Sequence, residues 1–528
     1  MDFDAELSCF NPDPALREWL TFTVDGLQDR VRQEAAEVAR IREQVALQSH
    51  EIRHKDLKIQ ALTLELAHYK RIRFGRTSEQ LGAEQKALFE ETLDTDLCAL
   101  EAEAEQLLSA PKRKALVQPH PGRRPLPEHL PSIEHRHEPE SCACGQCGKE
   151  MVKIGEGITE QLDVEPSKFF VHRHIRPQYA CRGCETVVAA PVPPAIIDGG
   201  LASPGLLTWV AISKFADHLP LYRLEQMAAR QDVPLSRSTL AEWVGRLGVA
   251  LQPLADRLAE KLRAQAILHA DETPVQQLDP GKGKTRRAYL WAYRSNDLSG
   301  GPPMVVFDYQ TSRSGSHARA FLQDWRGRLM VDDYGGYKAL FREGVTELAC
   351  LAHARRKFFD LHKEHQSPIA GEALQWIARF YAIEEEGRGL GIPERLALRD
   401  AKSRPLLEEY QAWLLRTRQT VAQGSATQKA IDYTLKRWSA LMRYAQSGES
   451  PIDNNPVENS IRPIAVGKKN WLYAGSERAG RRAAAIQSLI GTAKLNELDP
   501  QAWLKDTLEK LPNWPYSRID ELLPLKTA

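Results

Sequence analysis

The stretch AQAILHADETPV, residues 264–275, decides which fold this chain can adopt. It is an apolar run that ends at Asp271, and a second apolar run, RLMVDDYGGY, ends in the same way at Asp332 and Asp333. Short apolar runs bounded by turn residues are typical of buried strands. Between them, RAYLWAYRS and PPMVVFDYQ predict two more strands, and SHARAFLQDW predicts a helix. This order favours a mixed sheet with helices on both faces.

Carboxylates at the ends of two strands predict a divalent-metal site. Open sheets build their sites where strands end, and carboxylates held close together repel each other unless a cation lies between them. A third carboxylate, Glu458, stands in SPIDNNPVENSIRP, residues 450–463, where Asn and Pro residues predict the start of a capped helix. Asp271, Asp332 and Glu458 together could hold two Mg²⁺ for in-line attack at a phosphodiester. Each carboxylate taken alone is equally well explained as a turn or cap residue.

Length and composition set the class of protein. The chain has 528 residues, 42% hydrophobic and 27% charged residues, and a net charge of +1. These values are typical of a soluble globular protein of roughly three or four domains. The N-terminal residues do not have the pattern of a signal peptide, and no apolar run approaches the ~20 residues that cross a bilayer. We therefore expect a cytoplasmic protein with no membrane partner.

Residues 24–69 carry a heptad repeat. One seam position is apolar throughout and mostly β-branched: Val24, Val31, Val38, Val45, Ile52, Ile59 and Leu66. The second seam position is apolar only in part. A β-branched seam favours a parallel two-stranded coiled coil, so we expect a homodimer through this region. The alternative is an amphipathic helix that packs on its own chain.

Pro and basic residues dominate residues 111–131, which predicts an extended linker. Its basic clusters could contact phosphate, or the segment could serve only as a stiff spacer.

Two Cys-x-x-Cys pairs follow the linker and predict a structural Zn²⁺ site. The four cysteines are Cys144, Cys147, Cys181 and Cys184. Each pair can place two thiolates on one tight turn, and two such turns complete a tetrahedral Cys₄ site. The strand-like segment KFFVHRHIRPQYA between them fits a zinc-ribbon-like module. Cys142 is a competing ligand, His172 and His174 are weaker ones, and free thiols or a redox pair are the alternative.

The segment LYRLEQMAARQDVPLSRSTLAEWVGRL predicts two helices joined by a turn at Asp232–Pro234. This is helix-turn-helix spacing, and Arg237 and Arg246 could face DNA. Many helical hairpins bind no DNA, so the motif alone is a weak indication.

Six motifs, in the order HADETP, DDYGGY, HARRKF, DNNPVENSIRP, GKKNWLYAGS and SLIGTAKLNELDPQAWL, resemble the bacterial IS66 family of insertion-sequence transposases. The cysteine pairs, the linker GRRPLPEHLP and RFGRTSEQL share this resemblance, which runs from about residue 25 to 525. The resemblance implies a DDE-type enzyme with a ribonuclease-H-like catalytic domain and a helical insertion. It implies Asp271, Asp332 and Glu458 as the three carboxylates that hold Mg²⁺ or Mn²⁺. Asp333 fills a variable position of the motif and remains the alternative to Asp332.

Basic residues cluster on both sides of the predicted metal site. The expected DNA contacts are Arg355, Arg356, Lys357, Arg462, Lys468, Lys469, Trp471, Arg478, Arg481 and Arg482. Basic side chains neutralise phosphates and aromatic rings stack on exposed bases, although a solvated basic face is the alternative. His353, beside the first cluster, is more often a structural histidine than a catalytic one.

The sequence therefore predicts a multidomain α+β protein. Its expected segments are an N-terminal segment 1–23, a coiled-coil and helical region 24–110, a linker 111–135, a zinc module 136–195, a helix-turn-helix-like region 200–255, a catalytic core 262–365 and 449–495, a helical insertion 366–448 and a C-terminal element 496–528. The resemblance implies strand transfer between double-stranded DNA element ends and target DNA, with companion proteins of the same element as possible partners. The alternatives are a zinc-containing DNA-binding regulator without catalysis, and a nuclease or resolvase that cuts but does not join.

Overall fold

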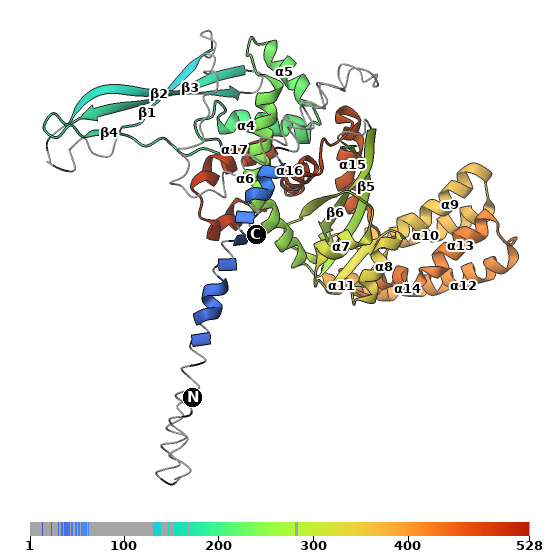
Figure 1. Cartoon of the computed structure of the whole chain (residues 1–528). Helices are drawn as coiled ribbons and strands as arrows, with labels where there is room; N and C mark the ends of the chain where they lie inside the picture. The colour runs from blue at the N-terminus through green and yellow to red at the C-terminus, as the bar shows by residue number, and fades with distance from the viewer. Residues whose placement is uncertain are drawn as a thin grey trace.

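The computed structural model describes scattered positions between Asp13 and Leu62, and then residues 130–138, 146, 149, 151–165, 168–279 and 284–526. Figure 1 shows a projecting sheet of β1–β4, a helical body that contains α4–α6, a second sheet that contains β5 and β6, and a lobe of helices that contains α9–α14. The acidic and linker segments, residues 84–106 and 111–129, lie outside the described residues.

The second sheet has five strands in the order β7-β6-β5-β8-β9. Its strands are β5 (Ile267–Asp279), β6 (Lys284–Ser295), β7 (Val305–Gln310), β8 (Arg328–Val331) and β9 (Thr346–Ala349). The β5–β6 and β6–β7 pairs are antiparallel, whereas β5–β8 and β8–β9 are parallel. The predicted mixed sheet is therefore confirmed, and so is the helix between its third and fourth strands, α7 (Gly315–Leu322).

Helices cover both faces of this sheet and one of its edges. They are α6 (Arg237–Arg263), α7, α15 (Asn455–Trp471) and α16 (Glu477–Leu495). Side chains alternate along β6, so Leu290 packs in the cluster that contains the apolar side of α15, whereas Trp291 packs in the cluster that contains α7. The outer edge of β7 is covered by α16, where the Ser488 hydroxyl accepts the Phe307 N–H at 2.8 Å. The edge strand is thus closed to pairing with another chain.

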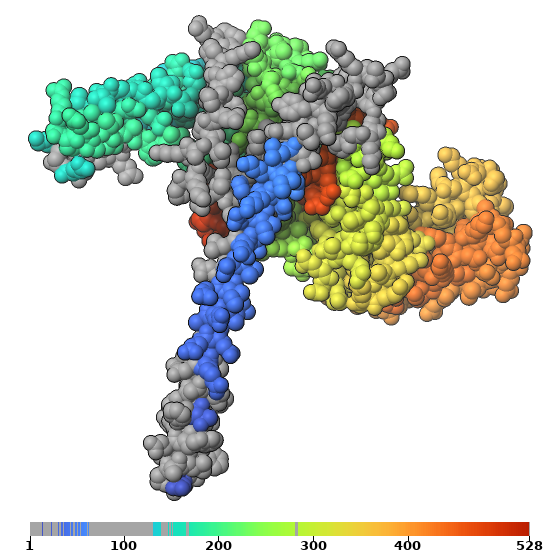
Figure 2. All heavy atoms as spheres, in the orientation of Figure 1, coloured from blue at the N-terminus to red at the C-terminus, as the bar shows by residue number. Residues whose placement is uncertain are grey.

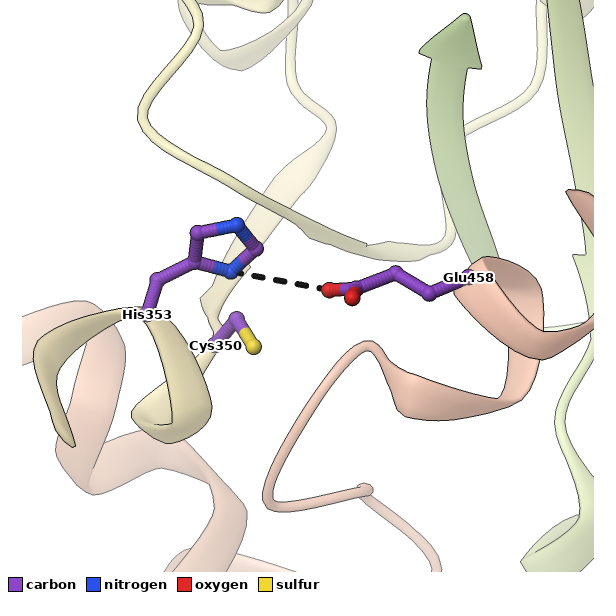
Figure 3. Close-up of side chains that lie close together, drawn as sticks. All are labelled: Cys350, His353 and Glu458. Carbon is purple, nitrogen blue, oxygen red and sulfur yellow. Dashed lines mark ion pairs between the residues drawn. The ribbon is translucent and has the colours of Figure 1, made fainter. Parts of the chain in front are cut away.

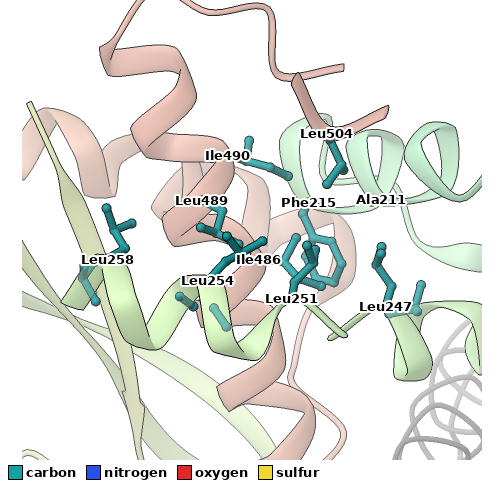
Figure 4. Close-up of a cluster of buried hydrophobic side chains, with 14 of the residues drawn as sticks. Ala211, Phe215, Leu247, Leu251, Leu254, Leu258, Ile486, Leu489, Ile490 and Leu504 are labelled. Carbon is teal, nitrogen blue, oxygen red and sulfur yellow. The ribbon is translucent and has the colours of Figure 1, made fainter. Parts of the chain in front are cut away.

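The largest core lies between α6 and α16 (Figure 4). Leu247, Leu251, Leu254 and Leu258 recur along α6 at helical spacing and pack on the side of α16 that carries Ile486. The predicted helix pair is present as α5 (Leu221–Ala229) and α6, and α6 begins after Ser236, whose side chain accepts the Thr239 N–H. α6 continues past residue 255 to Arg263, so it joins the helical region to β5 of the second sheet.

The C-terminal element packs on the same body. It contains α17 (Pro500–Lys510) and the short helices η7 (Leu511–Asn513) and η8 (Tyr516–Leu522). Leu504 of α17 is buried in the α6–α16 core, beside α4 (Pro204–Ala211) and η2 (Ile212–Ala216). Asp520 of η8 forms an ion pair with Arg257 of α6.

The segment between β9 and α15 is entirely helical apart from its connections. Its helices are α9 (Leu351–His365), α10 (Pro368–Glu386), α11 (Ile392–Leu398), η5 (Arg399–Ser403), α12 (Arg404–Thr420), α13 (Ala426–Lys436), α14 (Trp438–Met442) and η6 (Arg443–Gln446). They enclose their own core, in which Phe358, Phe380 and Tyr410 are fully buried. This part forms the lobe at the right of Figures 1 and 2.

The projecting sheet contains β1 (Ser132–Arg136), β2 (Val152–Glu165), β3 (Lys168–Ala180) and β4 (Val187–Ala189). β2 and β3 form a long hairpin, and β1 and β4 pair with β3. The hairpin meets the helical body at its 162–171 end, where the ring of Phe169 packs edge-on against Trp209 at 5.5 Å. The cysteine-bearing end of the hairpin points away from that contact.

The described positions between Thr23 and Leu62 are helical, and the helix extends away from the body (Figure 2). Four seam residues, Val38, Val45, Ile52 and Ile59, are 46–60% exposed. A single copy of the chain thus leaves a row of apolar side chains in water. Among the helices in the described part of the chain, none has the length and hydropathy that a membrane crossing requires.

Asn454, which is fully buried, fixes the start of α15 against the sheet. Its side-chain amide donates to the Ala270 carbonyl at 2.9 Å and its Oδ1 lies 3.0 Å from His269 Nδ1. Its backbone N–H donates to the Cys350 sulfur at 3.2 Å, and its carbonyl accepts the Glu458 N–H. One residue therefore connects β5, the end of β9 and the first turn of α15.

Replacing Asn454 with Ala should lower the free energy of unfolding by about 3 kcal/mol, because buried partners in β5 lose their hydrogen bonds. Equilibrium urea unfolding followed by circular dichroism measures this. Asn459→Ala, an exposed position on the same helix, should change stability by no more than about 0.5 kcal/mol. Equal effects of the two substitutions would contradict the assigned role of Asn454.

Candidate active site

Asp271 and Asp332 reach the same level of two adjacent parallel strands. The last paired residues of β5 and β8 are His269 and Met330. Two residues further along, Asp271 lies beside Asp332, with roughly 5 Å between the strands. Since side chains alternate, both carboxylates point to the face of the sheet that α15 covers. The β8–β9 register places Cys350 beside Asp332, on the same face of the sheet.

Asp271 is held in a buried and negatively charged environment. Its Oδ1 accepts the Glu272 N–H at 2.8 Å. Burial, together with the charges of Glu272, Asp332 and Glu458, raises the pKa of Asp271 from its ordinary value of 3.8 to about 7. The three predicted carboxylates are therefore close enough to interact through their charges.

Glu458 enters this site from the first turn of α15 and faces α9 (Figure 3). Its Oε1 lies 3.8 Å from His353 Nδ1, and its Oε2 lies 3.8 Å from Arg356 Nη2. Neither separation is a hydrogen bond. Val457 and Ile461 lie on the adjacent side of the helix and pack on the sheet, which leaves Glu458 directed toward α9.

Asp332 and Asp333 have different partners. The Asp332 Oδ1 accepts the Tyr334 N–H at 2.8 Å, which orients its carboxylate at the strand end. Asp333 forms an ion pair at 2.7 Å with Arg437, a buried residue of the helical lobe that also pairs with Glu347 of β9. Asp333 is thus neutralised within the chain, whereas Asp332 lies beside Asp271.

On the opposite face of β5, the buried carboxylate of Glu272 links this strand to residues that follow β7 and β8, and the sequence did not reveal these contacts. Its carboxylate accepts the Tyr337 hydroxyl and the Arg313 Nε–H, each at 2.7 Å. The Arg313 guanidinium lies 3.9 Å above the Tyr334 ring centroid. Burial raises the pKa of Glu272, although both donors oppose this. These contacts join β5 to the 334–337 turn and so fix the two aspartates relative to each other.

Cys350 is a second residue at this site that was not anticipated from the sequence. It is 3% exposed and immediately precedes α9. Burial raises the pKa of its thiol to about 12, so the thiol is protonated at neutral pH. A lone cysteine between apolar residues gives no signal in the sequence, and only the strand register places it near Asp332.

Six of the predicted DNA-contacting residues are exposed, and they lie on α9, α15 and α16. They are Arg355, Arg356, Lys357, Arg462, Lys469 and Arg481. Arg481 pairs with Glu477 at 2.6 Å. Lys468 donates to the Pro274 carbonyl at 2.8 Å, and the half-buried Trp471 lines an apolar pocket with Tyr473. Arg478 is half-buried.

Arg482 does not lie on this surface, so the prediction that it contacts DNA from an exposed position is wrong. It is 5% exposed, and its side-chain carbons fill the space against Gly248 of α6, where an added Cβ would lie 2.7 Å from Arg482 Cδ. Its guanidinium is therefore in the interior between α6 and α16. Direct contact with a DNA phosphate would require that this packing open.

Cys181 and Cys184 lie on one tight turn directly after β3, as two ligands of a zinc knuckle should. The Cys181 N–H donates to the Thr186 carbonyl at 2.9 Å, and Glu185 has a positive φ of 55°. Cys144 and Cys147 lie outside the described residues.

His174 stands seven residues before Cys181 in an extended strand, roughly 20 Å away, and its Nδ1 lies 2.9 Å from His137 Nε2. His172 is further still, so neither histidine joins this turn.

Comparisons with known proteins identify the family of the chain. Residues 199–482, more than half of the chain, match the family described as "Transposase IS66 family". The chain belongs to the IS66 transposase family. Further matches in this transposase are "IS66 C-terminal element" at 488–525, "zinc-finger binding domain of transposase IS66" at 141–185 and "Transposase C of IS166 homeodomain" at 61–134.

Two relatives of this transposase are uncharacterized proteins of Sinorhizobium fredii. Protein y4jD is 40% identical over 76% of this chain and 81% of its own length. Protein y4qI is 38% identical over 94% of this chain and 93% of its own length. The similarity therefore extends over nearly the whole IS66 transposase chain rather than over one domain.

The stability of the transposase without added divalent ions should depend on the charge of Asp271. Because the folded state keeps this carboxyl protonated up to about pH 7, it binds more protons than the unfolded state between about pH 4 and 7. The contribution of Asp271 to the free energy of unfolding therefore falls as the pH rises through this window. Asp271→Asn should be more stable than wild type at pH 8 by about 2–4 kcal/mol, and less so at pH 5.

Urea unfolding at the two pH values measures this difference. Titrating groups far from the site contribute equally to both chains, so the difference between the chains reports Asp271 and the carboxylates coupled to it. Asp324→Asn, at an exposed position of the same domain, should show no such pH dependence. Parallel pH profiles for wild type and Asp271→Asn would contradict the buried, repelled carboxylate.

Proposed function

We propose that this chain is a DDE-type transposase that cleaves insertion-sequence ends and joins the freed 3′-hydroxyl to target DNA. In this proposal Asp271, Asp332 and Glu458 hold two Mg²⁺ or Mn²⁺ ions in a ribonuclease-H-like catalytic domain. The observation that carries it is the meeting of three carboxylates from β5, β8 and α15, at least one of which is raised in pKa by burial and like charge.

The sheet supports the ribonuclease-H-like assignment. Three antiparallel strands are followed by two strands parallel to the first, in the order β7-β6-β5-β8-β9. Asp332 directly follows the carboxyl end of β8, and Asp271 lies beside it within β5, which continues to Asp279. The strand that was expected to end at Asp271 therefore runs past it, and the aspartates lie where the parallel pairing of β5 with β8 stops. Glu458 arrives on a helix that packs against the same face of the sheet.

The chemistry of the donors fits a divalent cation. Carboxylate oxygens are the ligands that Mg²⁺ and Mn²⁺ prefer. The Glu458 Oε1 is buried and has no hydrogen-bond partner among the described residues. The pKa of Asp271 is raised by burial and by the negative charges of its neighbours. A cation bound here would give Glu458 Oε1 a partner and would compensate the negative charge around Asp271.

When bound, the ions would activate the attacking hydroxyl and stabilise the leaving oxygen. The chain itself orients the ligands. The N–H groups of Glu272 and Tyr334 each hold one aspartate oxygen, and Asn454 fixes the turn that carries Glu458. Arg437 supports Asp332 over Asp333 as the second ligand, because it already pairs with the Asp333 carboxylate.

The exposed basic residues around Glu458 are the proposed DNA surface. Arg356 of α9 lies next to Glu458, and Arg462 and Lys469 follow on α15. DNA held by these residues would pass beside the three carboxylates. Non-specific attraction to phosphate is sufficient for this placement.

The remaining modules would organise the complex. Cys144, Cys147, Cys181 and Cys184 are the proposed ligands of one structural Zn²⁺, and the match of residues 141–185 to the IS66 zinc-finger domain supports this. The exposed seam residues Val38, Val45, Ile52 and Ile59 support a parallel homodimer through residues 24–69, because pairing would remove these side chains from water. Two copies could then hold two element ends.

Replacing Glu458 with Gln tests the proposed chemistry. With labelled element ends, a target plasmid and Mg²⁺, the wild type should give cleaved and joined products. Glu458→Gln should lower the rate by at least about 10²-fold, since an uncharged amide is a poor ligand for Mg²⁺, while DNA binding is kept. Glu477→Gln makes the same change at another glutamate in the first turn of a helix, α16, and this control should retain activity.

Each result of this assay distinguishes the proposed function from one of the alternatives. Cleavage by Glu458→Gln at the wild-type rate would exclude Glu458 as the third ligand. Cleaved ends without joined product would favour a nuclease or resolvase. If both chains bind DNA and neither cuts, the assay is repeated with the companion proteins of the element, and only continued inactivity of the wild type favours a DNA-binding regulator.

The double substitution Arg462→Ala and Lys469→Ala should weaken DNA binding mainly by removing phosphate contacts. The slope of log affinity against log salt concentration should therefore fall in magnitude by about two. Fluorescence anisotropy over a salt series measures it. Lys505→Ala with Lys510→Ala removes the same charge from exposed positions on α17 and should leave the slope unchanged, and an unchanged slope in the first variant would contradict the proposed surface.

A further inference from the structure

Three donor atoms of different chemistry meet at the edge of the candidate active site (Figure 3). They are Cys350 Sγ, one ring nitrogen of His353 and one carboxylate oxygen of Glu458, and all lie within 4.8 Å of one another. They come from the end of β9, the first turn of α9 and the first turn of α15. Three separate elements thus converge on one small space.

Two of these atoms lack the partners that buried polar atoms normally have. His353 Nδ1 and Glu458 Oε1 are both buried and have no hydrogen-bond partner among the described residues. They face each other at 3.8 Å, which is too long for a hydrogen bond. Cys350 Sγ accepts the Asn454 N–H at 3.2 Å, and such a donor stabilises a thiolate.

The donor set selects the kind of ion. Sulfur and imidazole are ligands of borderline and soft metals, whereas Mg²⁺ takes oxygen ligands. Zn²⁺ binds nitrogen and oxygen at ~2.0–2.2 Å and sulfur at ~2.3 Å. An ion between His353 and Glu458 would reach both at close to their present 3.8 Å separation. Water could take the remaining position of a tetrahedral site.

We propose that Cys350, His353 and Glu458 form a Zn²⁺ site that overlaps the catalytic site and inhibits it. Glu458 Oε1 already faces His353 on the α9 side, so Zn²⁺ bound here would hold the carboxylate in this orientation, away from Asp271 and Asp332. Zinc and Mg²⁺ therefore compete. The inhibition rests on the function proposed above, whereas the binding of Zn²⁺ does not.

Binding is tested first, with Co²⁺ as the probe for Zn²⁺. The full chain is titrated with Co²⁺ and the thiolate-to-cobalt absorption is followed, together with the number of ions bound per chain. Wild type should bind one ion more than Cys350→Ser or His353→Gln. Cys181→Ser is the reciprocal control, since it should lose the ion of the zinc module and keep the ion at Cys350.

Thermal unfolding followed by circular dichroism checks that each variant is folded. His353→Gln preserves a half-buried position of similar size, so it tests the site even if Cys350→Ser is destabilised. Equal ion counts and equal absorption in wild type and in a folded variant would overturn the proposal.

Inhibition is tested second, by adding Zn²⁺ to the cleavage assay. Zn²⁺ should slow cleavage, excess Mn²⁺ should restore it, and Cys350→Ser should need at least about tenfold more Zn²⁺ for the same effect. An equal zinc requirement in wild type and Cys350→Ser would overturn the inhibitory role. Cobalt binding at Cys350 in a chain that never cleaves DNA would support the site and count against the proposed function, and cleavage without this binding would do the reverse.

Discussion

The hydrogen bonds of Asn454 are the contact on which the candidate site depends. Asp271 and Asp332 are placed by the register of adjacent strands, but Glu458 follows β9 only after a long run of helices. A carboxylate that arrives so late in the chain needs an independent anchor. Asn454 supplies this anchor. It is fully buried, its side chain forms hydrogen bonds to β5, and it immediately precedes α15. One amide side chain thus ties the start of α15, and with it Glu458, to β5.

The helical lobe is attached to the sheet by buried cations at the same place. Arg437 pairs with Asp333 and Glu347, and Arg399, which is fully buried, donates to the carbonyls of Tyr444 and Ser450 just before α15. Buried guanidinium groups are costly to desolvate, so these contacts hold only when every partner is in position. A displacement of the lobe would therefore shift Glu458, which gives the lobe a direct physical connection to the metal ligands.

Much of the catalytic sheet could be predicted because its signals are local. The apolar runs that end at Asp271 and Asp332 identify strands, and Asn and Pro residues before Glu458 identify a helix start. Arg482 was misplaced because charge was taken as a sign of exposure. The small residues around it, Gly480 and Ala483–Ala485, indicate close helix packing and could have suggested burial. Cys350 had no comparable signal, since its position depends on the β8–β9 register alone.

If carboxylates from β5, β8 and α15 form one divalent-ion centre, crystals of the full chain grown with Mn²⁺ should show it by anomalous diffraction at the manganese edge. We expect anomalous density between the carboxylates of Asp271 and Asp332, with Glu458 turned toward it. Density at Asp333, or none near Asp271 in crystals whose fold is intact, would exclude this centre.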